Sequence, residues 1–472
     1  MKKEDICYMS ASDMAESIKK QELTSEEITE TIIERIEKIN PMINAYCTTT
    51  FDKAREMAKK ADDAVKKGKD LGLLTGIPTS IKDLASIKGV RTTFGSKLFE
   101  NYIPEENSSF VNKLIDAGCV ILGKTNTPEF GFKGVTDNFV FGASRNPWNL
   151  ERTTGGSSGG AAAAVASGMS PLAQGSDGGG SIRIPSSLCG CYGLKPSLGR
   201  VAIYPRLHTF AQTLTVVGPI VRHVKDAALM LDVMKGPHEG DRLSLPLDNV
   251  NYLEAIEIKP KKMRIGYSLK LGFAKVVDQE VEKAFLNAIQ LFEKLGWTIE
   301  ESKIKLKRPE SPFYTLWTTQ IGHFLNPKLK EWRDKIDPEL VKLVDIGVTY
   351  NGLAITKAMN DRRKLCDTLY TFFKDFDVLV TPTTAVPAFK LGMMYPPTIN
   401  GRSVSPTGWQ PFSFPFNLTG HPAATIPYGW SSEGLPIGLQ IVGKRFAEAT
   451  VLQVSKAFEE VAPWQDKKPE FD

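Results

Sequence analysis

Stretches with the periodicity of amphipathic helices alternate with short apolar stretches along much of this chain, and this alternation limits the fold more than any other feature. Residues 109–117 have helical spacing and precede the apolar run 119–122. The same order recurs at 285–295 with 297–299, and helical residues again precede the apolar run 378–380. Short apolar strands between helices are typical of a sheet that is covered on both faces. The pattern predicts an α/β fold.

Helix boundaries are visible near the N-terminus. The sequence Thr-Ser-Glu-Glu at 24–27 fits a capping box, and the helix that it opens is expected to stop at Asn40 and Pro41. Apolar residues over 54–65 also have helical spacing, and Gly68 stands where a C-cap belongs. We expect two helices here.

Charge and cysteine content exclude several classes of protein. The 472 residues carry 59 Lys and Arg against 54 Asp and Glu, a net charge of +5. This excess is small and interleaved, whereas nucleic-acid binders usually concentrate their basic residues. The six cysteines are scattered and no zinc spacing is present, so we expect neither a disulfide framework nor a metal or other cofactor. Without an apolar signal segment or a membrane-spanning run, the chain is expected in the cytoplasm, with no membrane partner.

Glycine and serine dominate residues 153–160, which run directly into the alanine-rich residues 161–166. Such a run can be a flexible linker, but a glycine loop that opens a helix directs backbone N–H groups at an anion. A phosphate loop is disfavoured because alanine, not Lys-Ser/Thr, follows the last glycine. Residues 155–159 match the G-x-S-x-G nucleophile elbow, which needs a preceding strand and a late histidine. His421 is late enough, whereas residues 149–154 are unfavourable for a strand.

A second glycine cluster, at 175–185, places three glycines directly before Ser181. Successive glycine N–H groups can form a nest for a developing oxyanion beside a hydroxyl nucleophile. A serine nucleophile needs a base, and the five histidines are scattered without local spacing. Lys82 is the remaining candidate, because an apolar setting such as residues 77–84 can lower the pKa of a lysine. On spacing alone, a lysine that extends to the surface is the more common alternative.

Three motifs taken together closely resemble the amidase signature family. They are GIPTSIKD at 76–83, GGSSGG at 155–160 and DGGGSIRIPSSLCGCYGLKPS at 177–197, in the order and approximate spacing of that family. The resemblance covers most of the chain and is weakest over about 240–405. It also includes three shorter segments, at 125–130, 417–423 and 434–440.

The resemblance implies one large α/β domain over residues 1–472, in which a mixed β-sheet core is surrounded by α-helices. Its expected parts are a helical N-terminal part over 1–60, a core over 60–240 and 405–472, and a variable substrate-facing wall over about 240–405.

The family also implies a serine hydrolase that cleaves carboxamide bonds with a Ser–cisSer–Lys triad. Carried over by motif, Ser181 is the nucleophile that forms the acyl-enzyme, and Lys82 is the ultimate base. Ser157, preceded by a cis peptide bond, relays the proton between them. The products are a carboxylic acid and an amine or ammonia.

Backbone groups and neighbouring side chains complete the expected site. The N–H groups of Gly178, Gly179, Gly180 and Ser181 are expected to hold the oxyanion. Gly178 departs from the family pattern, because many members carry Thr, Ile or Val there. The candidate substrate contacts are Thr127, Phe130 and Ser158.

Five residues near these motifs are expected to be structural. Asp177 and Arg183 should form an ion pair that stabilises the loop, and Cys189 and Cys191 should pack in the interior. His421 precedes a proline in a turn, which also favours a structural role.

The remaining segments bear on the substrate. Residues 409–417 look like stand-alone amidases, and the chain is similar to 6-aminohexanoate cyclic-dimer hydrolases and broad acylamidases. The aromatic-rich residues 305–375 fit an apolar acyl pocket and a core stripe equally well. We expect a hydrolase of small amides, with 6-aminohexanoate oligomers among the candidates, and a homo-oligomer is compatible with the sequence.

The alternative is a role in glutamyl-tRNA(Gln) amidotransferase, as the A-type component that supplies ammonia from glutamine to a partner protein. That component usually has Ser-Ser-Leu-Asp-Gln before Ile-Gly-Pro, whereas this chain has FAQTLTVVGP at 210–219. This departure favours the stand-alone enzyme.

Overall fold

A mixed sheet of 11 strands lies at the centre of the computed structural model, which describes residues 1–69, 72–206 and 212–471. The strands, in spatial order, are β1 (Tyr46–Thr49), β3 (Val120–Thr125), β2 (Pro78–Lys82), β6 (Leu172–Asp177), β8 (Val216–Val221), β7 (Tyr192–Lys195), β14 (Ala423–Trp430), β15 (Pro436–Gly443), β11 (Val378–Pro382), β9 (Arg264–Tyr267) and β10 (Thr298–Glu301). β2 runs parallel to β3 and β6, and β9 runs parallel to β10 and β11. The other neighbouring pairs are antiparallel.

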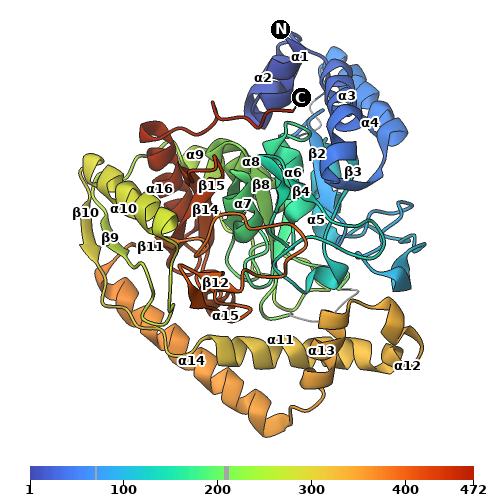
Figure 1. Cartoon of the computed structure of the whole chain (residues 1–472). Coiled ribbons are helices and arrows are strands. Elements are labelled where there is room, and N and C mark those ends of the chain that lie inside the picture. Colours follow the sequence, from blue (N-terminus) through green and yellow to red (C-terminus); the bar gives the residue numbers. More distant parts are fainter. Residues whose placement is uncertain (70–71, 207–211, 472) are drawn as a thin grey trace.

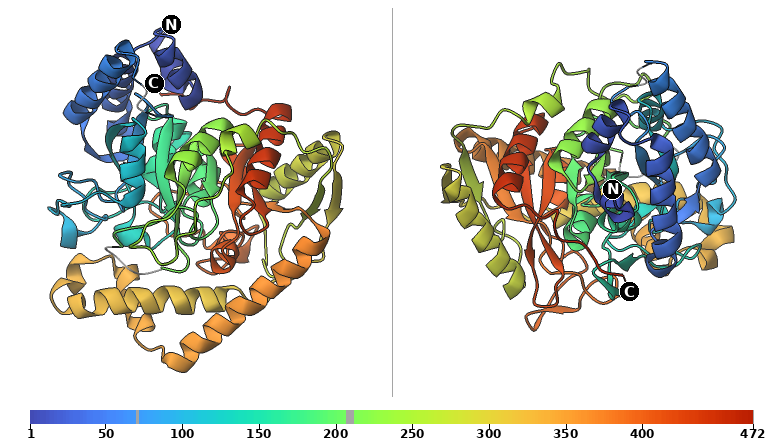
Figure 2. Two further views of the ribbon diagram at one scale, coloured as in Figure 1. Left: turned by 180° about the vertical axis from the view of Figure 1, so that it is seen from behind. Right: turned by 90° about the horizontal axis from the view of Figure 1, so that it is seen from above.

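Helices cover both faces of this sheet, which confirms the predicted fold class (Figures 1 and 2). α6 (Gly159–Ala166) packs against α7 (Arg183–Cys189), and α8 (Val224–Met234) packs against α16 (Glu448–Val461). The apolar residues of α6 are all buried, so this helix belongs to the core rather than to the surface. The other helices near the sheet are α5 (Ser109–Asp116), α9 (Tyr252–Ala255) and α10 (Gln279–Lys294).

The N-terminal helices begin and end close to their predicted positions. They are α1 (Lys3–Tyr8), α2 (Ala11–Lys19), α3 (Ser25–Ile43) and α4 (Phe51–Lys66). Thr24 and Glu27 form the predicted capping box of α3, but the helix continues past Pro41 until Asn44 adopts a left-handed conformation. Gly68 has the expected positive φ, just beyond the end of α4.

Residues 149–153 form a strand, contrary to the sequence-based expectation. β5 (Asn149–Thr153) pairs with β4 (Arg145–Asn146) in a separate two-stranded sheet. Its polar residues are tolerated because only Thr153 in this strand is buried. The strand is not part of the central sheet, so the loop at 155–159 lacks the strand that an α/β-hydrolase elbow requires.

The segment expected to form the substrate-facing wall, 240–405, is divided between two roles. β9, β10 and β11 extend the central sheet, whereas the helical cap lies below it (Figure 1). We use the term helical cap for α11 (Glu310–Leu325), α12 (Leu329–Trp332), α13 (Pro338–Gly347) and α14 (Gly352–Asp375). α11 contacts α13, α14 and α15 (Phe414–Thr419), which connects the cap to the C-terminal part of the chain.

Short elements complete the structure. They are the 3₁₀ turns η1 (Lys97–Phe99), η2 (Glu129–Gly131), η3 (Asn326–Lys328) and η4 (Arg333–Lys335), and the hairpin of β12 (Thr398–Ile399) with β13 (Arg402–Ser403). Among the described residues, no helix has the length and apolar character needed to cross a bilayer.

Candidate active site

The predicted site lies where two parallel strands end side by side. Lys82 is the last residue of β2, and Ser176 and Asp177 end the neighbouring strand β6. Because parallel strands present their carboxyl ends at the same edge of a sheet, these side chains converge there. The side-chain oxygen of Gln174 accepts the backbone N–H of Lys82 (3.1 Å), which fixes the end of β2 against β6.

Lys82 is fully buried and touches three serine hydroxyls. Its Nζ lies 2.7 Å from Ser157 Oγ, 2.8 Å from Ser158 Oγ and 3.1 Å from Ser176 Oγ. Burial lowers the pKa of this lysine well below its usual range, and the carboxylate of Asp177 opposes the shift only in part. The site therefore favours the neutral amine, which can accept a proton.

The loop before α6 brings Ser157 into contact with Lys82. The peptide bond between Gly156 and Ser157 is cis, as the family resemblance implies. A Cβ on Gly156 would lie 2.7 Å from the backbone of Val135, so the loop packs too closely there for any larger residue. The N–H of Ser158 donates to the carbonyl of Ser181 (3.1 Å) and thereby joins the two serine loops.

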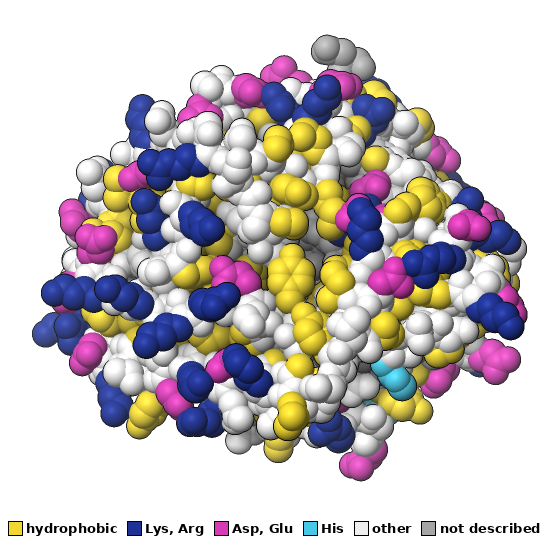
Figure 3. Space-filling model, turned by 60° about the horizontal axis from the view of Figure 1, so that its bottom comes forward, with side chains coloured by type: hydrophobic (Ala, Val, Ile, Leu, Met, Phe, Trp, Pro, Cys, Tyr) yellow, Lys and Arg dark blue, Asp and Glu magenta, His cyan; other side chains and the backbone are white. Residues whose placement is uncertain are grey.

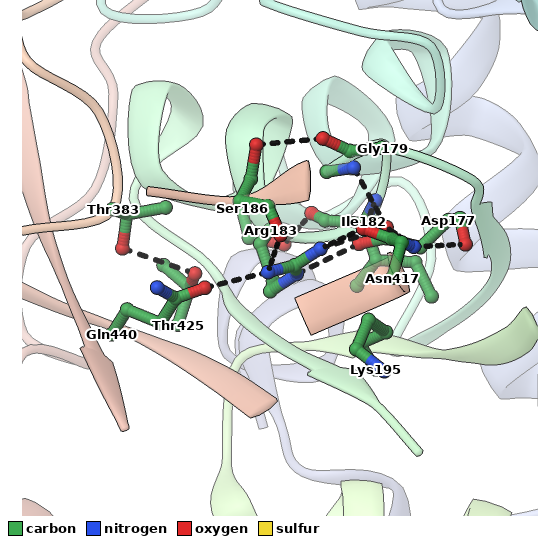
Figure 4. A network of polar contacts seen from close by, with 12 residues as sticks. Asp177, Gly179, Ile182, Arg183, Ser186, Lys195, Thr383, Asn417, Thr425 and Gln440 are labelled. Atoms are coloured by element: carbon green, nitrogen blue, oxygen red, sulfur yellow. Dashed lines mark hydrogen bonds and ion pairs between the residues drawn. The ribbon is translucent and has the colours of Figure 1, made fainter. Parts of the chain in front are cut away.

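The predicted ion pair between Asp177 and Arg183 is present, and it lies beneath the loop of Ser181 (Figure 4). Both side chains are fully buried, with Arg183 Nε 3.0 Å from Asp177 Oδ2. Arg183 also donates to the carbonyl of Ser413 and to the side-chain oxygens of Gln440 and Asn417. Burial alone would raise the pKa of Asp177, but Arg183 lowers it to about 2. The loop thus rests on a charged pair with well-satisfied hydrogen bonds.

One of the four N–H groups expected to hold an oxyanion points elsewhere. The N–H of Gly180 donates to Asp177 Oδ1 (2.7 Å), so the carboxylate already occupies it. Within the described part of the chain, the N–H groups of Gly178, Gly179 and Ser181 have no hydrogen-bond acceptor. These three groups remain available for a ligand.

Two cavities meet at Ser181, whose side chain reaches both. The first, the aromatic cavity, is lined mainly by Phe313, Tyr314, Trp317, Leu343, Met394 and Phe414. The second, the polar cavity, contains most of the polar groups, namely Ser108, Ser157, Gln174, Ser176, Arg206 and Thr215. Figure 3, viewed toward the helical cap, shows hydrophobic side chains around a hollow near the middle of this face, with charged side chains farther out.

The three candidate substrate contacts differ in position. Phe130 lines the polar cavity. Ser158 lies against Lys82 Nζ, and Thr127 is fully buried and is not among the described residues that line either cavity. The sequence had placed Thr127 near the site because it adjoins Phe130 in one motif, but its side chain bonds locally, to the carbonyl of Pro128.

Several contacting residues escaped the sequence-based prediction. Gln174 and Ser176 lie only a few residues before Ser181, and their alternation on β6 was the signal that could have identified them. Trp317 and Phe313 come from the helical cap, more than a hundred residues away. The aromatic stretch was noticed, but its pocket and core interpretations could not be separated without the fold.

The remaining predicted structural residues are buried. Cys189 and Cys191 are free thiols in the interior, next to α6. His421 stacks on Phe373 and contacts Thr419 Oγ1 through Nδ1 (2.9 Å). Burial lowers the pKa of His421 to about 3, so this histidine is neutral at ordinary pH. Among the described residues, no group of three or more His, Cys, Asp or Glu is placed to hold a metal ion.

The helical cap is attached to the site through η2. Glu129 accepts the N–H of Asp337, at the start of α13 (2.7 Å), and the hydroxyl of Ser96 (2.5 Å). Lys133 pairs with Asp337 (2.7 Å) and with Asp137 (2.8 Å). Burial raises the pKa of Glu129 to about 7, and the Asp337 carboxylate adds to this, whereas Lys133 and the hydrogen bonds oppose it.

Glu129 is therefore expected to make the protein less stable as pH rises from 5 to 8. Its pKa is about 7 in the folded protein and 4.5 as the ordinary value, so the folded state binds more protons between these limits. The loss approaches about 3 kcal/mol for a shift of this size. In Glu129→Gln this part of the pH dependence should disappear, which thermal unfolding at pH 5 and pH 8 can measure. Equal pH dependence in the two proteins would contradict it.

Comparison with known proteins agrees with this geometry. A family model described as Amidase matches residues 27–452. An acylamidase of Rhodococcus erythropolis is 39% identical over 99% of this chain and 98% of its own length. The A-type component of the glutamyl-tRNA(Gln) amidotransferase of Carboxydothermus hydrogenoformans is 35% identical over 99% of this chain and 100% of its own length.

Solved structures point the same way. A bacterial aryl acylamidase of the amidase signature family superimposes with a TM-score of 0.91 at 32% identity, covering 97% of each chain. A 6-aminohexanoate cyclic dimer hydrolase complexed with substrate gives a TM-score of 0.90 at 30% identity, covering 98% of this chain and 99% of that one. The fold and the matches together define an enzyme that hydrolyses amides. The chain belongs to the amidase signature family.

Proposed function

We propose that this chain is a self-sufficient amidase that hydrolyses small apolar amides through an acyl-enzyme on Ser181. The observation that carries the proposal is the 2.7 Å contact between Ser157 Oγ and the buried amine of Lys82. This contact places a base of lowered pKa one hydroxyl away from the loop of Ser181.

Hydrogen bonding around Lys82 supports Ser157 as the proton relay. A neutral amine can donate two hydrogen bonds and accept one. Ser158 Oγ donates to the carbonyl of Ser176 (3.2 Å), so its own proton is already used and it can only accept from Lys82. Within the described residues, Ser157 Oγ has no other acceptor for its proton. Its O–H is therefore able to donate to the Lys82 lone pair.

The proposed reaction moves one proton along this path. Ser181 Oγ attacks the amide carbon while its proton passes to Ser157 and the Ser157 proton passes to Lys82. The oxyanion is held by the free N–H groups of Gly178, Gly179 and Ser181. The C–N bond then breaks, and the relay returns a proton to the leaving nitrogen. Water hydrolyses the ester on Ser181 by the same path in reverse.

The aromatic cavity supports an apolar substrate. Phe313, Trp317 and Phe414 give this cavity flat apolar walls next to Ser181. The similarity to an acylamidase agrees with such a substrate. The second candidate, a component of an amidotransferase, is supported by the similarity to the Carboxydothermus hydrogenoformans protein. The residues at 212–219 that belong to the motif of that component differ here, and residues 210–211 lie outside the described residues.

We place the enzyme in the cytoplasm as a protein that needs a small-molecule amide and neither nucleic acid nor membrane. All six cysteines are free thiols, which supports a reducing compartment.

Amine or ammonia release by the purified chain tests the proposal. The panel should contain glutamine, simple aliphatic and aryl amides, a dipeptide amide and linear and cyclic 6-aminohexanoate oligomers, with Ser181→Ala as the blank. We expect serine-dependent release from apolar amides without any partner protein. Activity on glutamine alone, or activity only after partner proteins are added, would instead establish the amidotransferase role.

A further inference from the structure

Trp317 occupies a special position among the residues of the site. Only Gly131, Ser181 and Trp317 are common to the described linings of the aromatic and polar cavities. The indole and the backbone of Gly131 therefore border the place where the two cavities meet, at the proposed nucleophile. A substrate whose scissile bond reaches Ser181 must lie beside both.

The ring of Trp317 rests directly on the glycine loop. A Cβ on Gly178 would lie 2.8 Å from Trp317 Cζ3 and 3.1 Å from Trp317 Cη2. A Cβ on Gly179 would lie 2.7 Å from Phe313 Cζ. Gly178 is the position at which this chain departs from the family resemblance, and the missing side chain is what lets the indole approach the loop.

Neighbouring aromatic rings hold Trp317 in this position. Phe313 stacks on it with ring centroids 5.5 Å apart and planes 20° apart. Phe313 in turn contacts Phe414, with centroids 5.1 Å apart. Trp317 is only 7% exposed, so it has little room to move away from a substrate.

The opposite border is equally fixed. A Cβ on Gly131 would lie 2.8 Å from Leu84 Cδ1 and 3.1 Å from Ser157 Oγ, so the Gly131 backbone is packed against the proposed relay. Neither border can yield without disturbing the residues that do the chemistry.

We propose that Trp317, seated on Gly178, is a specificity-determining residue that selects amides whose acyl α-carbon is unbranched. The inference rests on the proposed function of Ser181. Attack on the carbonyl carbon brings the acyl α-carbon one bond from the reacting centre, where the indole limits its width. A methylene or a planar ring carbon fits between the borders, and an additional α-methyl group does not. Branches farther along the acyl group lie beyond this constriction.

Paired substrates test the proposal. Phenylacetamide and 2-phenylpropanamide differ by one α-methyl group, and 3-phenylpropanamide and 3-phenylbutanamide differ by one β-methyl group. In the wild-type enzyme, the α-methyl group should lower kcat/KM at least about tenfold more than the β-methyl group. In Trp317→Leu, the α-methyl penalty should fall to within about threefold of the β-methyl penalty.

Two further variants separate this role from a merely structural one. Trp332→Leu removes a half-buried tryptophan of the same cap that is absent from the described linings of both cavities, and it should keep the wild-type α-methyl penalty. Gly178→Ala should lower kcat/KM for phenylacetamide more in the wild-type background than in Trp317→Leu, because the smaller side chain leaves room for the Cβ.

The possible results distinguish the two proposals. Serine-dependent turnover with the same α-methyl penalty in wild type and Trp317→Leu would overturn the role of Trp317 alone. Absence of Ser181-dependent turnover from every amide would overturn the proposed function, and the selection by Trp317 with it.

Discussion

Ser181→Ala is expected to lower kcat/KM for amide substrates by on the order of 10⁴-fold or more, because no acyl-enzyme can form without the hydroxyl. The substitution removes one atom from a side chain that is 8% exposed and lines both cavities. The backbone N–H of residue 181 stays in place, so oxyanion binding is retained. Residual activity would report what binding and the oxyanion site provide without a nucleophile.

Two measurements complete this test. Ser187→Ala removes another buried hydroxyl of the same region, one that accepts the N–H of Gly438 (3.0 Å), and it should keep its turnover. A fluorophosphonate probe should add covalently to the peptide that contains Ser181, as mass spectrometry can detect. Near-wild-type kcat/KM in Ser181→Ala, or labelling at another serine, would exclude Ser181 as the nucleophile.

Much of the fold was predictable from local patterns because those patterns are also stable locally. The capping box at Thr24 predicted the start of α3, since the cap bonds need only neighbouring residues. The end of α3 was predicted too early, because Pro41 falls in the last turn and the helix can continue around it. The strand β5 was missed because its polar residues carry no strand signal, and it forms only through pairing with β4.

The site was predictable to the extent that it is written in contiguous motifs. Lys82, Ser157 and Ser181 each stand in a motif, and the structure brings Lys82 to Ser157 and the Ser157–Ser158 loop to Ser181. The N–H of Gly180 could not be assigned from sequence, because its acceptor is a side chain whose orientation depends on Arg183. Trp317 could not be assigned either, since its contact with Gly178 depends on how the cap docks.

Lys82→Met is the second substitution with a large expected effect, and it should separate activity from stability. Methionine has a similar length and is apolar, which suits a position with no exposure to solvent. Loss of the proposed base should lower kcat/KM by about 10²- to 10⁴-fold at neutral pH. Lys195→Met, which removes another fully buried lysine that bonds to the carbonyl of Pro196, should keep its turnover.

The stability of Lys82→Met should equal or exceed that of the wild type at pH 7. Burial lowers the pKa of Lys82, so folding releases a proton from an amine that is charged in the unfolded chain. The unfolded state binds more protons above the lowered pKa, and wild-type stability therefore gains a contribution as pH rises toward about 10.4, the ordinary lysine value. The variant lacks this contribution, and thermal unfolding between pH 7 and pH 9.5 measures the difference.

The pH dependence of turnover gives the same lysine an independent test. Only the neutral amine can accept a proton from Ser157, so wild-type kcat/KM should fall as pH is lowered through the pKa of Lys82 in the free enzyme. The residual rate of Lys82→Met should lack this fall, because methionine does not titrate. If Lys82→Met kept the wild-type rate and its pH profile, the base would have to be another group, and the 2.7 Å contact with Ser157 would be structural only.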